Sequence, residues 1–137
     1  MERLEQIIAS FAGREGPLLP ILHEVQAEFG HVSEEAIRVI AQALNLSRAE
    51  VHGVVSFYHD FRDAPEPRCV LKLCRAEACQ ARGVEALVAA LPENGRVKIE
   101  TVYCLGLCSV GPNAMIGKDV HARLDAAKLN ALIEGIA

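Results

Sequence analysis

Four of the five cysteines stand in two close pairs, and paired thiols are the usual building unit of a soft-metal site. Cys74 and Cys79 bound the segment CRAEAC, and Cys104 and Cys108 bound the segment CLGLC. Each pair directly follows a predicted strand, and loops at the strand ends of an α/β sheet can converge on a ligand. The residues between the pairs suffice for one helix and one strand, so both loops can emerge on the same side of the sheet. The sequence therefore predicts a four-thiolate cage made of two converging pairs.

The glycine-rich second loop favours an iron–sulfur cluster in this cage. A [2Fe–2S] cluster takes two thiolates on each iron, and Gly106 and Gly111 permit close backbone approach and amide hydrogen bonds to sulfur. Leu105, Leu107 and Val110 can shield such a cluster from water. Structural zinc is the first alternative, although its sites commonly use Cys-x-x-Cys turns. A thiol-exchange enzyme is less favoured because the chain has no Cys-x-x-Cys motif, and buried structural cysteines remain the plain alternative.

The fifth cysteine, Cys69, opens the first predicted strand, five residues ahead of Cys74. We interpret it as a small core or edge residue and not as a ligand. As the odd thiol it could still replace a mutated ligand.

The elements that must position the cysteine loops fall into two parts. Residues 1–61 carry apolar residues at helical spacing and predict an N-terminal bundle of four helices. Residues 62–68 (RDAPEPR) contain two prolines and mixed charges and predict a linker. Residues 69–137 alternate between strand and helix patterns, which indicates a small α/β domain.

Local signals give the expected bounds of these elements. In the first part a helix begins near Pro20 and ends before Gly30, Ser33 caps the next helix, and Ser47 with Glu50 has the spacing of a capping box. In the second part the expected order is β-α-β-β-β-α, with strands at 69–73, 96–103, 114–116 and 120–122, a helix at 84–91 and a final helix capped by Asp125.

Composition limits the classes of function. The chain has 137 residues, is 51% hydrophobic and has a formal net charge of −4, which favours a folded core and argues against nucleic acid as a partner. It has no apolar run of the length that spans a bilayer, and its N-terminus does not resemble a secretion signal. We therefore expect a cytoplasmic protein without membrane insertion, in which cysteines serve metal or redox chemistry.

The segments CRAEAC and CLGLCSVGPNAM, preceded by LLPILHEVQAEFGHV and LNLSRAEVHGVVSFYHDF, resemble the 24-kDa-type subunit family of respiratory complex I. The same family supplies gamma subunits to NAD-dependent formate dehydrogenases and diaphorase subunits to NAD-linked hydrogenases. The resemblance covers nearly the whole chain, and the second helical segment is most similar to the formate dehydrogenase subunits.

This resemblance implies a thioredoxin-like domain that carries one [2Fe–2S] cluster behind a helical bundle. Cys74, Cys79, Cys104 and Cys108 fall on the four ligand positions of the family motif, whereas Cys69 is not needed by it. The resemblance also implies a partner subunit that binds FMN and NADH, and an electron-transport role for this chain as a subunit of an oxidoreductase complex. Formate dehydrogenase is the predicted setting, with a hydrogenase diaphorase or complex I as alternatives.

No nucleotide-binding or nucleophile motif occurs in the sequence, so we expect no catalytic residue and no site for NAD, FMN or formate. A cluster of rings from His52 to Phe61 predicts core packing, with a docking face for the flavin subunit as the alternative. A different class of function is a redox-sensing DNA-binding regulator with an iron–sulfur or zinc site. Residues 34–57 have the pattern of a helix-turn-helix, with Asn45 and Leu46 as the turn and Ser47 at the start of the recognition helix. Against it, Arg48 is the only basic residue on the expected recognition helix.

Overall fold

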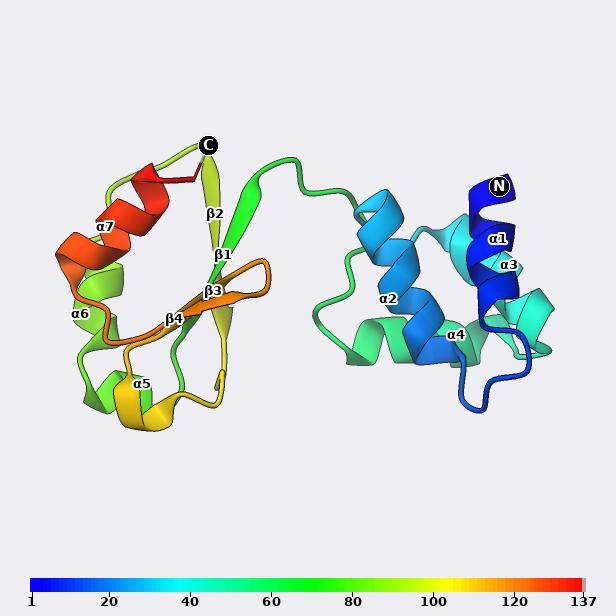
Figure 1. The fold of residues 1–137 in the computed structure, drawn as a ribbon, viewed down its shortest axis with the longest axis horizontal. Coiled ribbons are helices and arrows are strands. Elements are labelled where there is room, and N and C mark those ends of the chain that lie inside the picture. The colour runs from blue at the N-terminus through cyan, green and yellow to red at the C-terminus, as the bar shows by residue number, and fades with distance from the viewer. Residues whose placement is uncertain (137) are drawn as a thin grey trace. The chain divides into compact units, whose positions relative to one another are not determined.

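The computed structural model describes residues 1–136 and divides into two units, residues 1–66 and the unit that begins at Pro67 (Figure 1). The first unit is helical, and the second combines a sheet with short helices. None of the helices within residues 1–136 combines the length and the apolar character needed to cross a bilayer.

Helix caps predicted from the sequence set the bounds of the first unit's helices. The Ser33 side chain accepts a hydrogen bond from the Ala36 amide, and Ser47 and Glu50 form the predicted capping box. Gly30 ends its helix in the left-handed conformation, with φ of 76°. The helices are α1 (Glu2–Ser10), α2 (Leu18–Phe29), α3 (Glu34–Leu44) and α4 (Arg48–Phe57). Helix α2 begins two residues before Pro20, which a proline in the first helical turn allows because that turn's N–H groups have no partner inside the helix.

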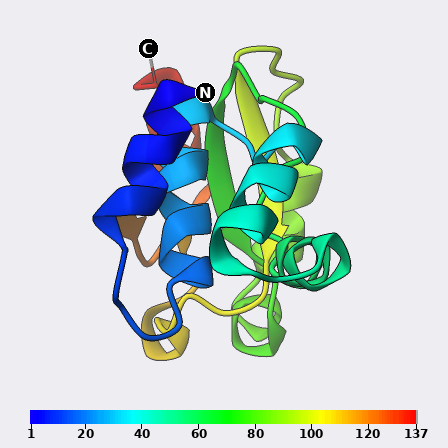
Figure 2. The same cartoon turned by 90° about the vertical axis from the view of Figure 1, so that its right-hand side faces the viewer.

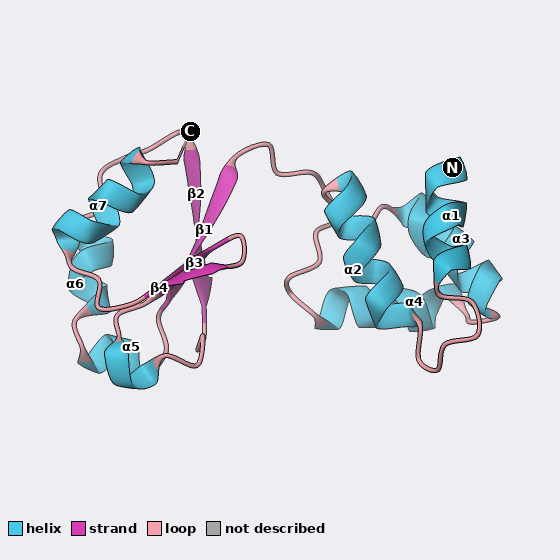
Figure 3. Ribbon diagram, viewed as in Figure 1, coloured by secondary structure: helices cyan, strands magenta, loops and turns pink. Residues whose placement is uncertain are grey.

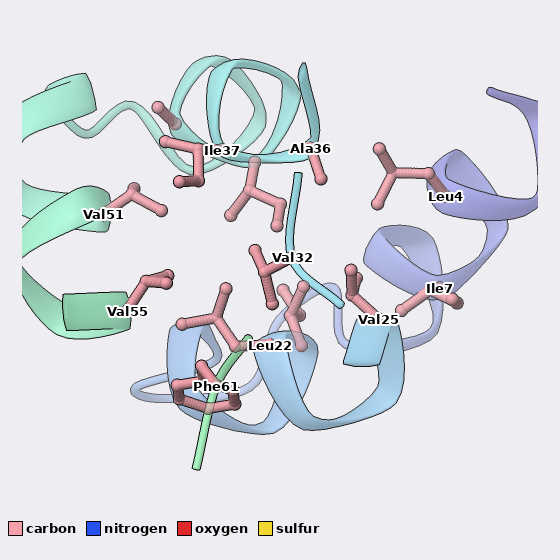
Figure 4. Packing of buried hydrophobic residues seen from close by; sticks show 13 residues of the cluster. Leu4, Ile7, Leu22, Val25, Val32, Ala36, Ile37, Val51, Val55 and Phe61 are labelled. Carbon is pink, nitrogen blue, oxygen red and sulfur yellow. The ribbon is translucent and has the colours of Figure 1, made fainter. Parts of the chain in front are cut away.

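The first unit has its own hydrophobic core. In Figure 4, side chains from all four helices point toward one another, with Val32 and Phe61 among them. Figure 2 shows α1 and α2 side by side. The Gln26 side chain accepts a hydrogen bond of 2.7 Å from the Arg62 amide, which holds the chain after α4 against α2. Phe61 is buried as predicted, but Phe57 is 73% exposed. His52, Tyr58 and His59 are also exposed, so the prediction of core packing was wrong for four of the five rings.

The second unit is built on a four-stranded mixed sheet of order β2-β1-β3-β4. Its elements are β1 (Cys69–Cys74), α5 (Glu77–Ala81), α6 (Val84–Ala89), β2 (Val97–Val102), the 3-10 helix η1 (Cys108–Val110), β3 (Ala114–Ile116), β4 (Asp119–His121) and α7 (Ala126–Glu134). Strands β1 and β2 are parallel, and β3 is antiparallel to both β1 and β4.

Helices α6 and α7 lie on the same side of this sheet (Figure 3). Val84 of α6 and Leu129 of α7 share a hydrophobic cluster with Leu71 and Leu73 of β1. Asp125 caps α7 as predicted, by accepting a hydrogen bond from the Lys128 amide. The sheet and its two covering helices therefore form a rigid support for the loops that leave β1 and β2.

One helix and several bounds differ from the expectation. Helix α5 was not predicted, because five residues are too few for a helical period to be visible in the sequence. Helix α6 ends at Ala89 and not at residue 91, and β1 ends at Cys74 and not at residue 73. Strand β2 spans Val97–Val102 and not 96–103, and β4 spans Asp119–His121 and not 120–122.

Candidate metal centre

The two cysteine loops leave the sheet at the same edge. Strands β1 and β2 run parallel with Cys74 opposite Val102, so both strands end at one edge. Cys104 follows the end of β2, while Cys79 lies on the short helix α5 that follows β1. Helix α5 contacts η1, which begins at Cys108. The fold thus brings the four predicted site residues to one end of the second unit.

The thiols are arranged as two pairs. The Sγ atoms of Cys104 and Cys108 are 3.5 Å apart, and Cys74 and Cys79 are buried in one hydrophobic cluster. Two thiolates bound at 2.3 Å to one tetrahedral metal are about 3.8 Å apart, so Cys104 and Cys108 have nearly the spacing that one metal ion requires. Among residues 1–136, no three His, Cys, Asp or Glu side chains gather into a single metal-binding group.

Backbone amides point at the sulfurs of the site. The Cys104 amide donates to Cys74 Sγ across the two loops, at 3.3 Å. The Gly106 amide donates to Cys104 Sγ, also at 3.3 Å. Such N–H groups stabilise negative charge on sulfur, whether the sulfur is a thiolate or a cluster ligand. The Cys104 amide also connects one cysteine pair directly to the other.

These contacts shift the acidities of the thiols in opposite directions. Burial opposes ionisation of Cys74, but the amides of Ala76, Cys104 and Leu105 outweigh it and hold the Cys74 pKa below its ordinary value. Burial is the main reason that the pKa of Cys79 is raised, with the neighbouring Cys74 adding to it. The pKa of Cys108 is raised chiefly by its hydrogen bond to Cys104. One thiol of the first pair is therefore prepared to become a thiolate before the other.

Backbone conformation explains the glycines of the second loop. Cys104 has φ of 83° and Gly106 has φ of 80°, and this left-handed conformation suits glycine at position 106. A Cβ at Gly111 would lie 3.0 Å from Cys79 Sγ. Glycine at 111 therefore lets the second loop approach the first pair, as the sequence predicts, whereas Gly106 serves the turn.

The fifth thiol lies elsewhere. Cys69 begins β1 and Cys74 ends it, so five strand steps separate them, which is about 16 Å. Cys69 is exposed, and β1 lies inside the sheet order. The prediction that Cys69 is a core or edge residue was therefore wrong. At this distance it cannot replace a lost ligand unless β1 rearranges.

Two polar features of the site were not predicted. Arg75 follows Cys74 directly and makes a two-point ion pair with Glu85 of α6, with Nε–Oε1 at 2.9 Å. Asn113 is buried just before β3 and its side chain donates to the Leu107 carbonyl at 3.0 Å. The position of Asn113 between a proline and the apolar run AMI was a visible signal, because a polar residue at the start of a covered strand requires a partner.

Comparison with known proteins identifies the family of this chain. The family described as thioredoxin-like [2Fe-2S] ferredoxin matches residues 4–137. A subunit of the NADH-quinone oxidoreductase of Rhizobium meliloti is 33% identical, over 97% of this chain and 86% of its own length. A subunit of the NADP-reducing hydrogenase of Solidesulfovibrio fructosivorans is 30% identical, over 93% of this chain and 81% of its own length.

A solved structure shares the fold. The crystal structure of an NAD+-reducing [NiFe]-hydrogenase in the H2-reduced state superposes with a TM-score of 0.69 at 29% identity, over 86% of this chain. This chain corresponds to 22% of the matched hydrogenase chain.

The chain belongs to the thioredoxin-like [2Fe–2S] ferredoxin family. The predictions of family, fold class and [2Fe–2S] cofactor are thus confirmed. Members of this family are electron-transfer proteins, and the two relatives are subunits of oxidoreductases.

Proposed function

We propose that Cys74, Cys79, Cys104 and Cys108 hold the [2Fe–2S] cluster, with Cys74 and Cys79 on one iron and Cys104 and Cys108 on the other. The observation that carries this proposal is the pairing of the thiols at one sheet edge with backbone amides directed at their sulfurs. When bound, the cluster supplies a reversible one-electron carrier. The residues of this chain hold it, donate hydrogen bonds to it and limit its contact with water.

The same chain acts as an electron-transfer subunit that exchanges electrons with the FMN of a partner NADH-binding subunit. Relatives named as NADH-quinone oxidoreductase and NADP-reducing hydrogenase subunits support the class of complex. The exposure of Cys104 and Cys108 supports electron exchange at this end of the unit, since a partner can approach these sulfurs closely. We place the bond-making steps of such a complex in its other subunits.

An NAD-dependent formate dehydrogenase in the cytoplasm is the setting we propose, from the resemblance of the segment LNLSRAEVHGVVSFYHDF to the gamma subunits of such enzymes. A hydrogenase diaphorase or respiratory complex I is the second candidate, and the names of the relatives favour it. A DNA-binding regulator has less support, because Arg48 on α4 is paired with Glu34 at 3.7 Å and that helix exposes Glu50 and His52.

Two measurements test the proposal, the first for the cluster and the second for the complex to which the chain belongs. Protein purified without air should contain iron and acid-labile sulfide in equal amounts, two of each per chain, and one zinc without sulfide would refute the cluster assignment. Affinity purification from the native cell should recover an FMN-containing subunit together with a molybdenum-containing one. Recovery of a nickel–iron subunit, or of quinone-linked membrane subunits, would replace formate dehydrogenase by the second candidate and leave the cluster assignment intact.

A further inference from the structure

Asn113 is the one buried polar or charged side chain among residues 1–136, with 1% of its surface exposed. It precedes β3, where its carbonyl accepts a hydrogen bond of 3.0 Å from the Cys74 amide. This bond extends the antiparallel pairing of β1 and β3 by one residue, as far as the first cysteine of the site. The backbone of Asn113 is thereby fixed to the buried cysteine pair.

The same residue reaches both cysteine pairs. Its side-chain Nδ2 donates to the Leu107 carbonyl at 3.0 Å. Leu107 immediately precedes Cys108 and is the residue from which η1 starts. Asn113 therefore contacts Cys74 through its backbone and the Cys108 turn through its side chain.

Burying an amide side chain costs free energy, so we infer that the Asn113 side chain does more than fill space. Within residues 1–136 no donor reaches Asn113 Oδ1, although the atom is buried. An apolar residue of similar volume would fill the same position without an unpaired acceptor. By contrast, the exposed thiols Cys104 and Cys108 have little surrounding core to fix them.

We propose that Asn113 is a positioning residue whose side-chain amide fixes the Cys108 turn relative to the buried pair Cys74 and Cys79. This inference rests on the proposed ligand set. Asn113 does not touch the metal through its side chain; it acts through the Leu107 carbonyl and so sets where the Cys108 sulfur is presented. Outer hydrogen bonds of this kind orient the ligands of metal sites and tune the bound group.

The test replaces Asn113 by leucine, which keeps the branch at Cγ and removes the donor. The matched control is Asn130→Leu, the same change on α7, away from the cysteine loops. Both variants are purified without air as full-length chains and compared with the parent by far-UV circular dichroism, by electron paramagnetic resonance after reduction, and by the rate at which an iron chelator removes the cluster.

We expect Asn113→Leu to keep the parent's circular dichroism, to shift the resonance g-values, and to lose its cluster about 10-fold to 100-fold faster, the usual range for outer-ligand changes. Asn130→Leu should match the parent in all three. A parent-like resonance spectrum and release rate in Asn113→Leu would overturn the inference while the cluster assignment stands. A parent chain without a [2Fe–2S] cluster would instead refute the proposed function itself.

A second variant covers the case in which leucine prevents folding. Asn113→Ser is smaller, and its hydroxyl is too short to reach the Leu107 carbonyl from the same backbone position. It should show the same changed spectrum and faster release with an intact fold. If neither variant folds, Asn113 serves the stability of the whole unit, and the inference of a specific positioning role is overturned.

Discussion

The two cysteine pairs have similar spacing in the sequence, but the fold treats them differently. Cys74 and Cys79 are 2% and 1% exposed and belong to the hydrophobic cluster under the sheet. Cys104 and Cys108 are exposed on a loop whose shape depends on hydrogen bonds and on a left-handed turn. The first pair is part of the core, and the second pair is attached to it.

This difference suggests that the two cysteine pairs have different roles within one proposed site. With the proposed ligand set, the core-embedded pair would hold its iron in a dry surrounding, which limits loss of the metal. The exposed pair would bring the other iron to the surface, where the proposed flavin partner can approach it. Each of the three predictions below tests whether this contrast between the pairs is real.

The largest effect is expected from removing a thiol of the exposed pair. Cys104→Ser should bleach the purified protein or strongly weaken its visible absorption and electron paramagnetic resonance, because one proposed ligand is lost. Cys69→Ser is the matched control, since it removes an exposed thiol at the other end of β1. It should leave both signals as in the parent.

Unchanged spectra in Cys104→Ser would remove this residue from the ligand set. Equal bleaching in Cys69→Ser would mean that thiol loss acts through general damage to the sheet. Either result would contradict the contrast between the two cysteine pairs, because the exposed pair would then have no specific role.

The next largest effect is expected on the free energy of unfolding, to which the two cysteine pairs should contribute differently. In the cluster-free protein, Cys79→Ser should lower the free energy of unfolding by about 1–3 kcal/mol, because it buries a hydroxyl in place of a thiol. Cys108→Ser should change it by less than about 0.5 kcal/mol, as surface substitutions usually do. Urea unfolding followed by circular dichroism measures both values, and equal losses for the two variants would contradict the contrast.

Much of this contrast is invisible in the sequence, for physical reasons. The capping residues Ser33, Ser47 and Asp125 and the convergence of the two loops could be predicted, because caps are local and consecutive parallel strands end at one edge. Burial depends instead on what covers a residue from elsewhere in the chain. The two pairs look alike in the sequence, yet only the first faces the cluster that contains Leu73.

The contacts that join the two cysteine pairs could not be predicted from the sequence either. The Asn113 bonds connect the start of β3 to β1 and to the Cys108 turn, and no local pattern specifies such a meeting of three segments. The prediction for Cys69 was wrong for a related reason. Alternation puts Cys69 on the same face as Leu71 and Leu73, but Cys69 is the first residue of β1 and is exposed.

The smallest effect is expected at the ion pair beside the buried cysteines. Arg75 hydrogen-bonds to Glu85, and this holds the pKa of Glu85 below its ordinary value. A lowered folded-state pKa means that the pair stabilises the fold above the unfolded pKa of about 4.3, and that this contribution is lost as pH falls through the folded value. Glu85→Gln should therefore lower stability slightly at pH 7, and its difference from the parent should disappear in acid.

The matched control is Glu93→Gln, a change of the same charge in the segment between α6 and β2. Thermal unfolding at several pH values should show a pH-dependent difference for Glu85→Gln and none for Glu93→Gln. Because both residues of the pair are partly exposed to water, the effect must stay small. A loss at Glu85 as large as that in Cys79→Ser would show that the first pair is held by its charged neighbours and not by the core, and the contrast between the two pairs would need a different physical cause.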